Sequence, residues 1–99
     1  MSATNAENYT ECILSDLRDS IARIDESIVQ LLVDRVKIGQ QIAMVKCSAD
    51  IPIHDAEQES RVIQRSVKRA HDLALPDDDV RKLFCRIIGM TRRAEYGVS

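Results

Sequence analysis

One position in the apolar seam of the predicted first helix carries a positive charge. Apolar residues recur from Leu14 to Val45 at alternating steps of three and four, and this spacing requires an apolar residue at position 35. The sequence has Arg35 there. Because a guanidinium is costly to remove from water without a counter-charge, we expect a carboxylate of the protein or an anionic ligand to meet it.

The residues that follow Arg35 on the same helical face suit a ligand. Gly39, Ile42 and Lys46 stand four, seven and eleven positions later, so two cations flank a glycine. The glycine leaves room for a small anion against the backbone, although close packing of two helices explains it equally well. Two separated cations are what a dicarboxylate requires. The other interpretation of Arg35 is a salt bridge, or a polar residue that fixes the register of a helical bundle.

The sequence lacks the residues that other kinds of chemistry need. There is no nucleophile beside a base and no glycine-rich phosphate loop. The three cysteines form no CxxC pair, and His54 and His71 have no ligand-like neighbours, so we predict no metal site. What remains is chemistry that needs only positioning and electrostatic stabilisation, or a role without chemistry.

Composition limits the partners. A chain of 99 residues buries a small core unless it associates. The net charge of -2 and the aromatic content of 3% argue against nucleic acid. No stretch approaches the roughly 18 apolar residues of a membrane span, and the first ten residues lack the features of a signal peptide. We therefore predict no membrane association, a cytoplasmic location and reduced cysteines.

The apolar seam predicts one long helix that would position the two cations. The helix contains no proline, and Ser15 or Asp16 could cap its N-terminus. Residues 1–12 are polar, and we expect them to be a flexible N-terminus ahead of a helical domain at 13–99. A second apolar set, which includes Val33, widens the seam and indicates burial on more than one side.

Two shorter helices are predicted after the long one. Residues 47–54 interrupt the helical pattern, and Asp55 is placed to cap a second helix that fades near Asp72. Pro76 and the acidic residues after it begin a third helix, which runs to about Glu95. The predicted fold class is all-α. Since such a chain forms only a thin layer, an intertwined homodimer of long helices is the simplest way to close a core.

Taken together, four segments resemble the all-helical class of chorismate mutases, which includes the related isochorismate-pyruvate lyases. Their order and spacing carry the resemblance from about Leu14 to Glu95. The segments are LRDSIARIDESIVQLLVDR (Leu17 to Arg35), the lysine of IAMVK (Lys46), IPIHDAEQE (Ile51 to Glu59) and LFCRIIGMTRRAE (Leu83 to Glu95).

The resemblance implies a reaction and a role for the cations. Arg35 and Lys46 would bind the carboxylates and the ether oxygen of chorismate, with Gly39 between them. Arg18 would reach in from the other subunit of an interlocked dimer. The reaction implied is the unimolecular rearrangement of chorismate to prephenate, which needs no cofactor. The site would hold the folded, reactive conformer and place cations where negative charge builds on the ether oxygen.

The resemblance also implies substrate contacts from the two shorter helices. Asp55 and Glu59 correspond to the family's contacts with the ring hydroxyl, and Asp55 can cap its helix at the same time. Thr91 and Glu95 fall at the family's two positions on the last helix.

Two positions depart from the family's pattern. Gln58 stands where many mutases carry an arginine, which removes a positive charge beside Glu59. Glu95 stands where many carry glutamine, and a carboxylate there would repel the charge that develops on the ether oxygen unless it were protonated, a state that burial favours. We therefore expect turnover to fall as pH rises. Alternatively, Glu95 pairs with an amino group, as a 4-amino-4-deoxychorismate mutase would require.

Two further functions stay open on the sequence. An isochorismate-pyruvate lyase would use a similar cationic site to eliminate pyruvate from isochorismate. A non-catalytic helical dimer that regulates a partner enzyme would use Arg35 only to fix its register.

Overall fold

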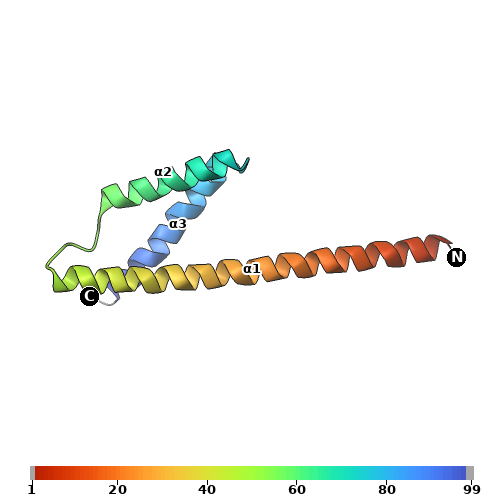
Figure 1. The fold of residues 1–99 in the computed structure, drawn as a ribbon, viewed down its shortest axis with the longest axis horizontal. Helices are drawn as coiled ribbons and strands as arrows, with labels where there is room; N and C mark the ends of the chain where they lie inside the picture. Colours follow the sequence, from red (N-terminus) through yellow and green to blue (C-terminus); the bar gives the residue numbers. More distant parts are fainter. Residues whose placement is uncertain (1, 98–99) are drawn as a thin grey trace. The chain divides into compact units, whose positions relative to one another are not determined.

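The computed structural model describes residues 2–97, with side chains from residue 5 onward; Met1 and residues 98–99 of the predicted domains lie outside it. Its regular structure is three helices, α1 (Ser2–Ser48), α2 (Ala56–Asp72) and α3 (Asp77–Tyr96) (Figure 1). The predicted all-α class, with one long and two shorter helices, is confirmed. Within the described residues, no helix combines the length and the apolar composition needed to cross a membrane.

α1 begins well before the predicted start. The helix runs from Ser2 through the positions of Ser15 and Asp16, so the prediction that one of them caps it is wrong. The segment before Leu14 has no apolar periodicity, but it contains alanine and glutamate, which favour helix without any packing. Residues 2–12 are therefore helical, and their predicted flexibility stays a prediction.

The chain divides into two compact units, residues 1–33 and residues 34–99. The first unit consists of the N-terminal turns of α1. Its predicted seam residues are all solvent-exposed in the single chain, with exposed fractions between 41% and 66%. They are Leu14, Leu17, Ile21, Ile24, Ile28 and Leu31.

The second unit contains the last turns of α1 together with α2 and α3. α2 and α3 are joined by the short segment 73–76 and pack against each other (Figure 1). The buried apolar side chains described in this unit are few and mostly small: Ala43, Val67, Ala70 and Ile88. A core of this size stabilises a chain only weakly.

The ends of the helices are fixed by local hydrogen bonds. The side chain of Asp55 accepts a hydrogen bond from the backbone N–H of Gln58 at 3.0 Å, which confirms the predicted cap of α2. α1 is followed by Asp50 in the left-handed region (φ 55°), and the N–H of Ile51 donates to the carbonyl of Lys46 at 2.8 Å. This turn reverses the chain directly beside Lys46.

Candidate active site

A cavity of about 260 Å³ lies within the second unit, near the lower end of the size range of small-molecule sites. All three helices and the segment between α1 and α2 line it. Arg18 belongs to the first unit and is not among the lining residues. The cavity brings together the other eight predicted site residues: Arg35, Gly39, Lys46, Asp55, Gln58, Glu59, Thr91 and Glu95.

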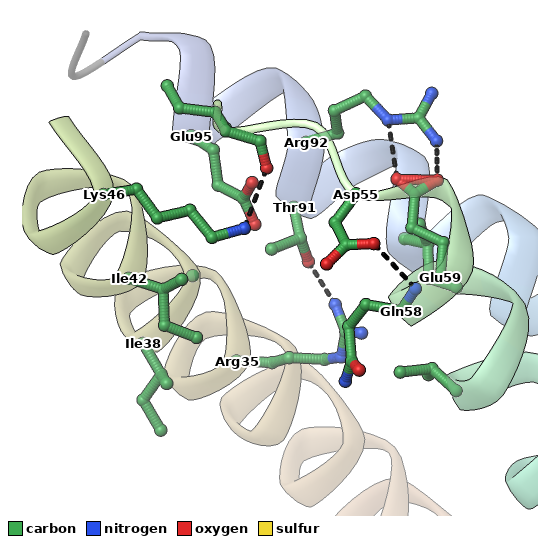
Figure 2. A pocket seen from close by; sticks show the side chains of 14 residues that line it. Arg35, Ile38, Ile42, Lys46, Asp55, Gln58, Glu59, Thr91, Arg92 and Glu95 are labelled. Carbon is green, nitrogen blue, oxygen red and sulfur yellow. Dashed lines mark hydrogen bonds and ion pairs between the residues drawn. The ribbon is translucent and has the colours of Figure 1, made fainter. Parts of the chain in front are cut away.

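Arg35 is oriented by the third helix. Its Nη1 donates a hydrogen bond to Thr91 Oγ1 (Figure 2). The Thr91 hydroxyl in turn donates to the carbonyl of Ile87 at 3.1 Å. Thr91 is only 6% exposed, so its position is set by packing. Because this partner is a neutral hydroxyl, the bond directs the guanidinium without cancelling its charge.

Lys46 is oriented in a similar way by the segment that follows α1. Its Nζ donates to the carbonyl of Ile53 at 3.0 Å, again a neutral acceptor. Figure 2 shows Arg35 and Lys46 extending from α1 towards the side chains of α2 and α3. The cavity therefore presents two separately oriented cations, an arrangement suited to a ligand with more than one anionic group.

Gly39 allows α3 to approach α1. A Cβ atom at this position would lie 2.4 Å from Thr91 Cγ2 and 3.1 Å from Glu95 Oε1. The space beside the glycine is thus filled by α3. Of the two interpretations that the sequence left open, the close packing of helices is the one supported by this geometry.

The start of α2 contributes polar groups with defined partners. One carboxylate oxygen of Asp55 is used in the cap, and the side-chain oxygen of Gln58 accepts from Arg61 Nε at 3.2 Å. Both side chains are exposed on the cavity rim. Each keeps further hydrogen-bonding capacity for a ligand.

Arg92 also lines the cavity, and it was not predicted from the sequence. Its Nε donates to Glu59 Oε2 at 3.1 Å, and its Nη2 donates to Glu59 Oε1. The bond to Glu59 raises the pKa of the Arg92 guanidinium, so Arg92 stays charged. Its helical spacing from Ile88 and Glu95 was the available signal, since positions i, i+4 and i+7 share a face.

The charges around the cavity balance. Arg35, Lys46 and Arg92 stand against the three acidic side chains, which are Asp55, Glu59 and Glu95. Within residues 2–97, no three histidine, cysteine, aspartate or glutamate side chains gather closely enough to hold a metal ion. The arrangement can bind a small polyanion and stabilise developing negative charge.

The helices and the cavity define an all-α protein with a pocket lined by three cations and three acidic side chains. Residues 17–96 match the family described as chorismate mutase type II, and the chain belongs to that family.

Three curated relatives are similar to this chain over different shares of their own length. The bifunctional chorismate mutase/prephenate dehydratase of Aquifex aeolicus is 38% identical over 55 residues, which are 56% of this chain and 15% of that protein. The T-protein of Enterobacter agglomerans is 28% identical over 75 residues, 76% of this chain and 20% of that protein. The chorismate mutase of Methanocaldococcus jannaschii is 28% identical over 71 residues, 72% of each chain. This chain thus spans only a small part of the first two relatives.

The contact at Gly39 predicts a difference between two glycines. Gly39→Ala places a methyl group against Thr91, so we expect the free energy of unfolding to fall by about 1–3 kcal/mol. Gly89→Ala is the control, because a Cβ atom there meets only Arg93 Nη1 at 3.5 Å. Helix propensity should make that variant more stable by up to about 1 kcal/mol. Urea unfolding measures both, and equal stability of the two variants would contradict the packing role of Gly39.

Proposed function

We propose that this protein is a chorismate mutase, which rearranges chorismate to prephenate. The observation that carries the proposal is the pair of cations, Arg35 and Lys46, directed into one cavity by neutral acceptors. Chorismate carries two carboxylates and an ether oxygen that gains negative charge in the transition state. Membership of the chorismate mutase type II family supports the assignment.

The proposed mechanism needs no covalent intermediate and no cofactor. The carbon–oxygen bond of the ether bridge breaks while a carbon–carbon bond forms within the same molecule. Arg35 holds a carboxylate and thereby selects the folded conformer in which the reacting carbons are close. Lys46 donates to the ether oxygen, where its charge is worth more in the transition state than in the ground state.

We further propose that the working unit is a homodimer. The large apolar side chains along the seam of α1 are solvent-exposed in the single chain, and a second copy presents an identical seam against which they can pack. In this dimer Arg18 completes the site of the partner chain as a second carboxylate ligand. The three free cysteines are compatible with the predicted cytoplasmic location.

A two-substrate assay tests the reaction. Wild-type protein should convert chorismate to prephenate, and Arg35→Ala should lower kcat/KM by roughly 100-fold to 1,000-fold because the cation that holds a carboxylate of the reactive conformer is lost. Arg23→Ala removes an exposed arginine of α1 outside the cavity and should leave the rate unchanged.

The products separate the competing functions. Salicylate and pyruvate from isochorismate alone would identify the lyase, and turnover of 4-amino-4-deoxychorismate alone would identify the amino-substrate mutase. Absence of any product would favour the non-catalytic helical dimer.

Mixing two inactive variants tests the contribution of Arg18. Arg18→Ala and Arg35→Ala should each be nearly inactive alone. If Arg18 serves the partner's site, a heterodimer has one intact site, so an equimolar, re-equilibrated mixture should recover about a quarter of the wild-type sites. The measurement is the initial rate of the refolded mixture against each variant refolded alone. A mixture as inactive as its components would rule out the shared site.

Glu95 predicts the effect of an amide at its position. Its side chain lies beside Gly39 and lines the cavity together with Lys46. A carboxylate repels the negative charge that develops on the ether oxygen, whereas the amide of a glutamine donates to it, so Glu95→Gln should raise kcat roughly tenfold, the worth of about one hydrogen bond. Steady-state kinetics of the two proteins measure this difference, and a kcat of Glu95→Gln equal to or below that of the wild type would show that Glu95 does not repel this charge.

A further inference from the structure

The side chains of Glu59 and Arg92 form a two-point contact between α2 and α3. The Nε and Nη2 atoms of Arg92 engage both carboxylate oxygens of Glu59 (Figure 2). The Glu59 side chain is 23% exposed and that of Arg92 is 41% exposed, so the pair is screened only in part by solvent. Each carboxylate oxygen has a second lone pair, so Glu59 can still accept a hydrogen bond from a ligand.

Arg92 also decides whether the formal charges around the cavity balance. With it, three cations face three acidic side chains; without it, two cations face three. The other neighbours of Glu59 do not replace this charge. Gln58 is neutral, and His54, whose Nε2 lies 3.6 Å from Glu59 Oε2, is charged only when protonated. A dianionic ligand would therefore meet a net negative lining if Arg92 were absent.

We propose that Arg92 is a positioning residue that neutralises Glu59 and fixes it as the acceptor for the ring hydroxyl of the substrate. Arg92 thereby sets the affinity of the site for a dianion. This inference rests on the proposed function.

A positioning role has a kinetic signature. The ring hydroxyl takes no part in the bonds that break and form, so Glu59 holds it about equally in the ground state and in the transition state. Loss of such uniform binding raises KM and leaves kcat nearly unchanged. A contact that only ties α2 to α3 would instead lower stability without this split between KM and kcat.

Arg92→Met removes the charge and keeps much of the side chain's bulk. We expect KM for chorismate to rise roughly tenfold to a hundredfold, the range for a hydrogen bond to a charged group, with kcat changed by less than about threefold. Arg92→Lys keeps the charge but loses the two-point contact, so its KM should lie between those of Arg92→Met and the wild type. Arg93→Met, at the neighbouring exposed arginine of α3 outside the cavity, is the control and should match wild type.

A second substitution separates the electrostatic role from a structural one. Gln58→Arg, introduced into the Arg92→Met variant, returns a cation to the cavity from α2. We expect KM to recover while the thermal unfolding midpoint stays that of Arg92→Met, because a cation on α2 cannot tie α2 to α3.

Two results would overturn the inference. One is a KM of Arg92→Met equal to that of the Arg93→Met control, and the other is a KM that does not recover in the Gln58→Arg, Arg92→Met double variant. Wild-type protein that does not turn over chorismate would instead overturn the proposed function, and the inference with it. If the wild type turns over chorismate, a failed Arg92 test counts against the inference alone and leaves the proposed function standing.

Discussion

The close approach of α3 to α1 at Gly39 is the constraint on which the cavity depends. The methyl group of Thr91 occupies the space that any side chain at position 39 would need. From that place the Thr91 hydroxyl reaches Arg35, and Glu95, one turn further along α3, comes to lie beside the same glycine. A residue with no side chain on one helix therefore determines the position of polar groups on the other.

Two of the three cations that line the cavity have neutral hydrogen-bond acceptors, as the proposed binding of an anionic substrate requires. Arg35 and Lys46 both donate to neutral oxygens, which fix their direction and preserve their charge. Arg92 differs, because its charge is matched by Glu59. This division suits electrostatic catalysis, in which donors must be in place before charge develops.

Much of this arrangement could be predicted from the sequence, because helix periodicity and capping are local. The break after α1, the Asp55 cap and the placement of the two cations on one face all follow from spacing. The early start of α1 could not be predicted from an apolar pattern, since the segment lacks one. Arg92 was missed because an arginine on a half-exposed helix resembles a solvated residue, and its partner lies 33 positions away.

The exposed seam of α1 has a consequence for how the protein behaves in dilute solution. If a second copy covers the seam, folding and association become one equilibrium, and the fraction of working sites depends on the protein concentration by mass action. Specific activity would then decline on dilution, and the apparent melting temperature would rise with concentration. For a chain that folds only as such a dimer, abundance itself becomes a determinant of stability.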